Sequence, residues 1–487
     1  MRKRFEQQLI LGQKPIGQTP IPVKEKGALI ELIAALKEIF TNEEYNSQIF
    51  NILEAKLSKS KLRTGRKGMD LWMIFVLSQV RLCLDLSYEN LHNYTNNHYT
   101  LRFLMGVERE FGYERIEYDY QNIYDNVTLL DNETVKQLND VIVAFGYSVF
   151  KIKKKETEAL RLKTDSFVVE SNVHFPTDYN LLWDCARKCL DMVVGFTEKY
   201  DHIEGWRKIA SWRHDAKGLM RELGKASSSG GKNKDKRIKG AAEKYIVKTK
   251  TLLAKLKKET PNFPLNDLDD LAAHCVLENF MSLMDKHIDL LERRVIKGEK
   301  IPHDEKMFSV FEQYTEMIKK GKLHPNVELG KKLAITTDQF NLIVDYQIME
   351  DEQDRDIVIK LADRMLSKDK VASWSFDKGY WNKEAKALLQ LEVKTVVMPK
   401  LGKLNEQETE EEHSRIFKKL KNKHSAIESN INELEHRGLD RCPDRTFHHY
   451  KNYIALGVCA YNLRKIGKAI MDERREQLKN KSLRQAA

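Results

Sequence analysis

Long apolar runs are missing from this sequence of 487 residues. The most apolar stretch, residues 69–86, is interrupted by Asp70, Gln79 and Arg81. A helix that crosses a membrane needs about 20 consecutive apolar residues, so we expect no membrane span. The basic N-terminus, MRKRFEQQ, leads into no apolar segment, which argues against a signal peptide. The sequence therefore points away from membrane and secreted proteins.

Cysteine is scarce and follows no pairing pattern. The six cysteines are scattered, and no CxxC or HxxxH motif accompanies Cys185 and Cys189, which lie four residues apart on a predicted helix. We therefore predict reduced, partly buried thiols rather than a disulfide framework or a zinc site. A reducing cytoplasm follows from this prediction.

Positive charge, in contrast, is in excess. The 83 Lys and Arg residues outnumber the 72 Asp and Glu residues, which gives a net charge of +11, and 41% of all residues are apolar. This length and composition favour two or three domains with sizeable cores. The charge suits a polyanionic partner, although many soluble proteins carry a similar excess without one.

Much of the excess charge lies in residues 224–258, which hold twelve Lys or Arg residues and two acidic residues, a net charge of +10. The stretch KASSSGGKNKDKRIKG in this segment is rich in Ser, Gly and Lys and predicts a mobile loop. The segment is either a solvated surface or an arm that grips phosphates, and we favour the arm. The candidate phosphate contacts are Lys232, Lys234, Lys236, Arg237 and Lys239.

The first 150 residues predict a helical domain, with helices over 27–40 and 43–57. A basic patch over 56–67 then precedes a helix with one apolar face and two short helices. Such helices form either a helix-turn-helix reader of DNA or a plain bundle, and the basic patch favours DNA contact. The patch contributes the candidate contacts Arg63, Arg66 and Lys67, and the apolar face comprises Trp72, Phe75, Val76, Gln79, Val80 and Cys83.

From residue 159 onward, strand patterns appear. ALRLKTDSFVVESNVHF predicts a strand with Asp165 inside it, and a helical stretch follows over 184–330. KLAITTDQFNLIVDYQIM predicts a hairpin, KVASWSF a strand that ends at Asp377, and EVKTVVMP a further strand. A charged helical stretch with Glu428 comes next. Strands that alternate with helices imply a mixed sheet covered by helices.

Three acids stand at distinctive places in this order. Asp165 lies inside a strand, where a carboxylate is costly unless it is paired, hydrogen-bonded or bound to a cation. Asp377 follows a strand directly, and ligand sites in open α/β sheets gather at strand ends; a cap for the next helix is the simpler alternative. If Glu428 joined them, three carboxylates would suit hard cations such as Mg²⁺ and phosphodiester chemistry. Spacing alone does not establish that they converge.

Three segments that contain these acids resemble the motifs of bacterial insertion-sequence transposases of the DDE type. They are TDSFVVESNVHFPTDYNLLWD, SFDKGYWNKEA and HSAIESNINELEHRGLDRCPDRTFHHYKNYIALGVCAYNLRKIG. The similarity is greatest to the group left outside the named insertion-sequence families, and it spans about 160–190 and 330–470. The three motifs in this order are specific, whereas any one of them alone is weak.

The resemblance implies an α/β fold with a ribonuclease-H-like mixed sheet in 159–183 and 331–470. A large helical insertion, 184–330, would interrupt the sheet, an all-helical domain, 1–150, would precede it, and a basic tail, 471–487, would follow. It further implies that Asp165, Asp377 and Glu428 hold two Mg²⁺ or Mn²⁺ ions and are catalytic. The activity would be cutting at terminal inverted repeats and joining to target DNA.

The resemblance also implies double-stranded DNA as a partner, a homodimer on DNA and a place in the bacterial cytoplasm with the nucleoid. Lys378, Arg437 and Arg441 become candidate DNA contacts. Many relatives carry a basic residue about seven positions past the third acid, where this chain has Glu435. This departure leaves the basic partner of the acid open. Glu433 and Glu435 lie near Glu428 in the sequence and remain alternatives to it as the third acid. Two rival functions also remain, a nuclease that cuts without joining and a basic DNA-binding protein whose acids are structural.

Overall fold

The computed structural model describes residues 4–5, 13–57, 68–108, 115–154, 159–319 and 326–486. It contains two compact units. We call Met1–Asn172 with Ile318–Ala487 the sheet unit, and Val173–Met317 the helical insertion. In the described ranges, no helix is long and apolar enough to cross a membrane. All six cysteines lie in the described ranges and five of them are buried, which confirms that these side chains are largely buried.

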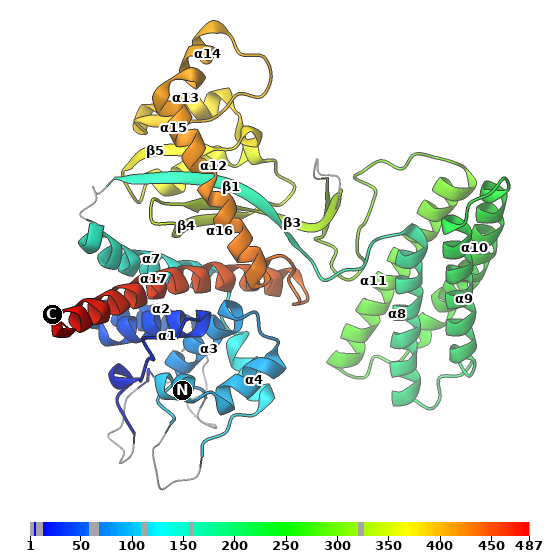
Figure 1. Cartoon of the computed structure of the whole chain (residues 1–487). Coiled ribbons are helices and arrows are strands. Elements are labelled where there is room, and N and C mark those ends of the chain that lie inside the picture. Colours follow the sequence, from blue (N-terminus) through cyan, green and yellow to red (C-terminus); the bar gives the residue numbers. More distant parts are fainter. Residues whose placement is uncertain are drawn as a thin grey trace. The chain divides into compact units, whose positions relative to one another are not determined.

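The sheet unit is built on a mixed sheet of six strands (Figure 1). In the order β3-β1-β5-β6, β1 runs antiparallel to β3 and parallel to β5, and β5 runs parallel to β6. Strands β2 and β4 both pair with β3, β4 in the predicted hairpin. The strands are β1 (Leu160–Glu170), β2 (Glu316–Lys319), β3 (Val327–Thr337), β4 (Ile343–Ile348), β5 (Val371–Phe376) and β6 (Thr395–Val397). The predicted mixed sheet is therefore confirmed.

One long helix, α17 (Phe447–Ala486), forms much of the core of the sheet unit. It packs against α1, α3 and α7, as Figure 1 shows, and against β4. Helix α17 crosses α1 so closely that a Cβ atom at Gly467 would lie 1.7 Å from the carbonyl oxygen of Glu31. The helices before the sheet are α1 (Ala28–Thr41), α2 (Glu43–Leu57), α3 (Leu71–Cys83), α4 (Tyr88–Asn97), α5 (Tyr99–Leu104), α6 (Tyr120–Val127) and α7 (Asn132–Lys154).

Helix α3 is buried on every side, so the prediction of a single apolar face was wrong. All 13 of its residues are buried. Helices α1, α2, α4, α6 and α17 all contact it. The polar residues Gln79 and Arg81 consequently lie in the interior.

The second half of the sheet unit carries shorter helices between and after the strands. The charged stretch that was predicted as one helix is divided into three α-helices and a π-helical turn, η6 (Glu435–Leu439). The elements are α12 (Val358–Leu366), α13 (Lys383–Glu392), α14 (Glu406–His413), α15 (Arg415–His424) and α16 (Ala426–Leu434), with 3-10 turns η4 (Asp354–Asp356) and η5 (Lys378–Tyr380).

The helical insertion is a four-helix unit with its own apolar core. Its helices are α8 (Asp178–Lys199), α9 (Ile209–Ser228), α10 (Lys234–Glu259) and α11 (Leu268–Leu291). The predicted 16-residue loop is wrong, because α9 ends at Ser228 and α10 begins at Lys234. The helical stretch also ends earlier than predicted, since β2 begins at Glu316 and β3 at Val327.

Candidate functional site

Asp165 and Asp377 lie at neighbouring positions on parallel strands. Strands β1 and β5 pair in parallel with Thr164 opposite Phe376; Asp165 is the next residue in β1, and Asp377 directly follows the end of β5. Buried hydrogen bonds support this register, because Trp374 Nε1 donates to Thr164 Oγ1 at 2.8 Å. Asp377 occupies the N-cap position of η5, but its side chain makes no capping hydrogen bond. The simple capping role is thus not observed for Asp377.

Glu428 lies in the first turn of α16, a helix that packs against β1. Its side chain is exposed, whereas its neighbour Ile427 is buried. Glu433, an alternative third acid, is committed elsewhere: it forms ion pairs with Arg464 and with Lys465, the latter at 2.6 Å. Glu433 is thus held by cations of α17, whereas Glu428 is exposed at the start of α16.

The charges of these acids act on one another. Asp165 is half-buried, and burial is the largest cause that raises its pKa to about 7. The backbone amide of Ser166 donates to Asp165 and lowers the pKa, while the carboxylates of Asp377, Asp354 and Glu428 raise it. Like charges that crowd in this way favour protonation or a bound cation. The three predicted acids therefore form one electrostatic cluster.

Asp354 is the acid that the sequence reasoning missed, since its position suggested only a helix cap. Its two carboxylate oxygens accept hydrogen bonds from Ser166 Oγ at 2.7 Å and from Lys332 Nζ at 2.8 Å. The cap of η4 is made instead by Gln353 and Asp356. Asp354 therefore links Ser166 on β1, the residue after Asp165, to Lys332 on β3. The sequence signal that could have pointed to Asp354 was its position shortly after the predicted hairpin.

A buried tyrosine and a half-buried histidine lie near these acids. Tyr380 is 1% exposed, and its pKa is raised well above the ordinary value by burial and by the charges of Asp354, Asp165 and Asp377. His424 Nδ1 lies 3.0 Å from Ser375 Oγ, and burial lowers the pKa of His424 to about 4. His424 is therefore neutral at physiological pH and adds no positive charge beside the acids.

The donor chemistry of the cluster suits a hard divalent cation, because carboxylate oxygens are the ligands that Mg²⁺ prefers. In the described ranges, however, no three His, Cys, Asp or Glu side chains are gathered closely enough to hold a metal ion as they stand. The fit to a metal therefore rests on ligand type and on crowded charge. The predicted convergence of the three acids around a metal stays a prediction.

The candidate DNA contacts near the acids have different surroundings. Lys378 is exposed directly after Asp377. Arg437 Nη1 donates to the carbonyl oxygen of Cys83 at 3.1 Å, and Arg441 Nη2 donates to Asn172 Oδ1 at 3.1 Å. Both arginines thus have partners within the sheet unit, whereas Lys378 faces solvent. The candidates Arg63, Arg66 and Lys67 lie outside the described residues.

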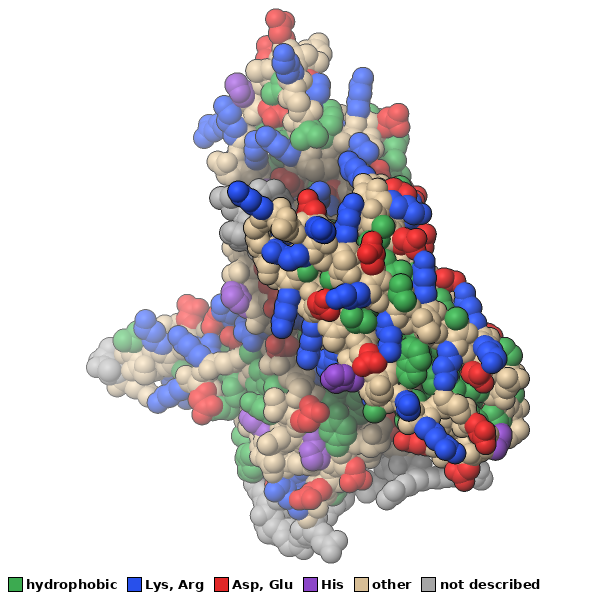
Figure 2. Space-filling view, turned by 90° about the vertical axis from the view of Figure 1, so that its right-hand side faces the viewer, with side chains coloured by type: hydrophobic (Ala, Val, Ile, Leu, Met, Phe, Trp, Pro, Cys, Tyr) green, Lys and Arg blue, Asp and Glu red, His purple; other side chains and the backbone are tan. Residues whose placement is uncertain are grey.

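Not all the charge of residues 224–258 is available to a partner. Four lysines of α10 form ion pairs with acids of neighbouring helices: Lys244, Lys248, Lys250 and Lys257. In Figure 2, Lys and Arg side chains accordingly alternate with Asp and Glu side chains over the insertion that faces the viewer. Among the lysines that form no ion pair with a described residue, four lie close together in the sequence: Lys232, Lys234, Lys236 and Lys239.

The available cations gather at the connection between α9 and α10, and we call Lys232, Lys234, Lys236, Arg237 and Lys239 the basic turn. Arg237 holds the turn together, because its Nη2 donates to the carbonyl oxygen of Gly230 at 2.6 Å. The structure therefore presents the predicted phosphate contacts on a short turn and on the first turns of a helix.

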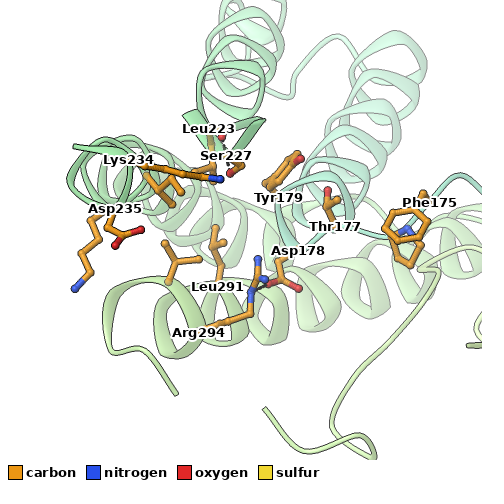
Figure 3. Close-up of a pocket in the computed structure, with 14 residues that line it drawn as sticks. Phe175, Thr177, Asp178, Tyr179, Leu223, Ser227, Lys234, Asp235, Leu291 and Arg294 are labelled. Carbon is orange, nitrogen blue, oxygen red and sulfur yellow. Dashed lines mark hydrogen bonds and ion pairs between the residues drawn. The ribbon is translucent and has the colours of Figure 1, made fainter. Parts of the chain in front are cut away.

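A cavity of about 660 Å³ adjoins the basic turn within the insertion (Figure 3). Its walls combine apolar side chains, such as Leu223 and Leu291, with Lys234 and Lys239. Arg294 forms an ion pair with an acid of α8 at its edge, as the dashed line in Figure 3 marks. Two lysines of the basic turn thus also line a concave surface.

Residues 297–463 match the family model of the transposase DDE domain. The match contains Asp377 and Glu428 and excludes Asp165, which precedes the helical insertion in the sequence. No curated protein and no solved structure matches the chain.

Proposed function

We propose that this protein cuts DNA at the terminal inverted repeats of an insertion sequence and joins the 3′ ends to target DNA. The match of residues 297–463 to the transposase DDE domain supports this proposal. The observation that carries the proposal is the pair Asp165 and Asp377 on neighbouring parallel strands, with Glu428 on a helix packed against one of them. The sheet order β4-β3-β1-β5-β6, three antiparallel strands followed by two parallel ones, supports a ribonuclease-H-like core.

In this proposal Asp165, Asp377 and Glu428 hold two Mg²⁺ or Mn²⁺ ions. When bound, such ions lower the pKa of water or of a 3′ hydroxyl and stabilise the charge of the leaving oxygen. The carboxylates supply negative charge that the sheet and α16 hold in place. Because Asp377 and Glu428 are exposed, a DNA strand can reach them without a rearrangement of the core.

The neighbouring residues position the DNA. The ammonium of Lys378 would contact a phosphate near the scissile bond, since it is exposed directly after Asp377. The basic turn would bind phosphates in a manner independent of sequence, because lysine ammonium groups contact the backbone rather than base edges. Two ends must be held together for joining, so we propose a homodimer on double-stranded DNA.

The experiment uses the purified chain and DNA duplexes taken from both borders of its own gene, with and without Mg²⁺. We expect Mg²⁺-dependent nicking at the borders and products in which the freed 3′ ends are joined to a target plasmid. Nicking without joining would establish the nuclease instead. DNA binding with no cleavage in Mg²⁺ or Mn²⁺ would contradict an enzymatic role and would favour a DNA-binding protein whose acids are structural.

A further inference from the structure

In the turn that ends the third-acid helix, Gly438 and Leu439 are buried, and the position of Gly438 suits only glycine. In η6, Gly438 has a φ of 94°, a left-handed conformation that side chains disfavour. A Cβ atom at Gly438 would lie 2.4 Å from Asp85 Oδ1 and 2.6 Å from Tyr453 Oη. The end of α16 is thus seated in a close-fitting place in the core, whereas Glu428 at its start is exposed.

Residues from both ends of the sequence hold this turn. Arg437 Nη1 donates to the carbonyl oxygen of Cys83, the last residue of α3. Tyr453 Oη, from α17, donates to the carbonyl oxygen of Gly438 at 3.1 Å. The turn therefore lies between a helix of the first hundred residues and the C-terminal helix.

A largely buried ion pair lies beside the same turn. Arg81 on α3 is 3% exposed and donates two hydrogen bonds to the Asp444 carboxylate, at 2.9 and 2.6 Å. Its guanidinium carbon lies 4.0 Å from the ring centroid of Tyr88 and 5.4 Å from that of Tyr453. Arg81 thus orders the ring whose hydroxyl group holds Gly438. A pair so desolvated is seldom the most stable solution for a core, which favours a role in setting geometry.

We propose that Arg81, Asp444, Tyr453 and Gly438 form a positioning junction that fixes the direction of α16 and thereby the place of Glu428. The inference rests on the proposed function, in which Glu428 is a metal ligand. Leu434, the last residue of α16, lies six residues after Glu428, a lever of about 9 Å at 1.5 Å per residue. A tilt of about 6° at this end of α16 would move Glu428 by about 1 Å, a displacement that can reduce a rate about 100-fold.

The alternative is a junction that stabilises the fold without positioning α16. A second arginine–carboxylate pair in the chain provides a control for this alternative. Arg364 also donates two hydrogen bonds to a carboxylate, that of Asp345, which is 5% exposed, at 3.0 and 2.7 Å. That pair joins α12 to β4 and does not touch η6. Arg364→Lys should therefore lower stability without moving α16.

The test compares Arg81→Lys, Tyr453→Phe and Gly438→Ala with Arg364→Lys. Three quantities are measured: hydrogen exchange of residues 426–439, Mn²⁺ binding to the protein without DNA, and cleavage across a Mg²⁺ titration. For the junction variants we expect faster hydrogen exchange in 426–439. Their affinity for Mn²⁺ should fall about tenfold, and the Mg²⁺ concentration that gives half-maximal cleavage should rise about tenfold. Their DNA affinity should stay within about twofold of the wild type. Arg364→Lys should change only the melting temperature.

The outcomes separate the two proposals. If the wild type neither cleaves nor binds Mn²⁺, the proposed function fails, and the exchange data still show whether the junction holds α16. If the wild type cleaves and the junction variants match Arg364→Lys in exchange and in metal dependence, the junction is structural and the inference is overturned. Tyr453→Phe keeps its aromatic ring and loses one hydroxyl group, so it tests the junction even where Gly438→Ala fails to fold.

Discussion

The acidic cluster of the sheet unit and the basic turn of the helical insertion handle charge in opposite ways. At the cluster, a half-buried carboxyl group lies near other acids, and burial first, then the charges of those acids, raises the pKa of Asp165. At the turn, four lysines form no ion pair with any described residue and three of them are exposed to solvent, where water screens their mutual repulsion. In the proposed function, the crowded acids would serve the chemistry and the exposed lysines would bind phosphates.

The largest expected effect is that of Asp377→Asn, which removes one charge from the cluster and keeps the shape of the side chain. Loss of a metal ligand costs several kcal/mol of transition-state stabilisation, so we expect cleavage to fall about 1,000-fold or more. DNA affinity should stay within about twofold of the wild type, as a gel shift on the same preparation would show. Retained Mg²⁺-dependent cutting would remove Asp377 from the catalytic centre.

A second comparison sharpens the assignment of the third acid. Glu428→Gln should reduce cleavage about 100-fold or more and leave stability nearly unchanged, because the side chain is exposed. Glu433→Gln should behave in the opposite way, since it weakens the ion pairs with Arg464 and Lys465 that fasten α16 to α17. Cleavage rates and melting temperatures of both variants are the measurement. The reverse pattern would make Glu433 the third acid.

For the basic turn, we expect a change in salt dependence when its five cations are replaced by Gln. If about half of them touch phosphate, the slope of log affinity against log salt should fall by roughly two units, at about 0.9 per phosphate. Specific and nonspecific DNA should weaken together. The matched control replaces the ion-paired Lys244, Lys248, Lys250 and Lys257, and it should leave the slope nearly unchanged. Equal slopes for the wild type and the basic-turn variant would show that the phosphate contacts lie elsewhere in the protein.

The smallest expected effect is on thermal stability. A ligand at ten times its dissociation constant stabilises the folded state by about 1.4 kcal/mol, so saturating Mg²⁺ should raise the melting temperature by a few degrees. Asp165→Asn should remove this dependence on Mg²⁺, as a melting series in Mg²⁺ and in EDTA would show. An equal rise in the variant would place the cation away from the cluster.

The strands and their acids could be predicted from the sequence because each depends on a local pattern. Alternation and β-branched residues marked β1, β3, β4 and β5, and the end of β5 placed Asp377 at the sheet edge. Asp354 could not be assigned in this way. Its partners, Ser166 and Lys332, come from strands distant in the sequence, and the local pattern suited a helix cap equally well.

Burial of α3 and pairing of the α10 lysines were missed for a related reason. One face of α3 is covered by α17, whose residues follow more than 350 positions later, so no local window reveals that the whole helix is interior. The acids that neutralise α10 lie on α9, on α11 and beyond it. A charge sum over 224–258 therefore overstated what a partner would meet.

The place of α17 at the centre of the sheet unit has a consequence for biosynthesis. Helices α1, α3 and α7 bury their apolar faces against α17, which begins at Phe447, almost 300 residues after α7 ends at Lys154. At a translation rate of about 5–20 residues per second, these helices wait on the order of 15–60 s on the ribosome for their partner. Chaperones that shield apolar surface would be engaged throughout that interval, and a product released before Phe447 would carry its acids without the helix that completes the core.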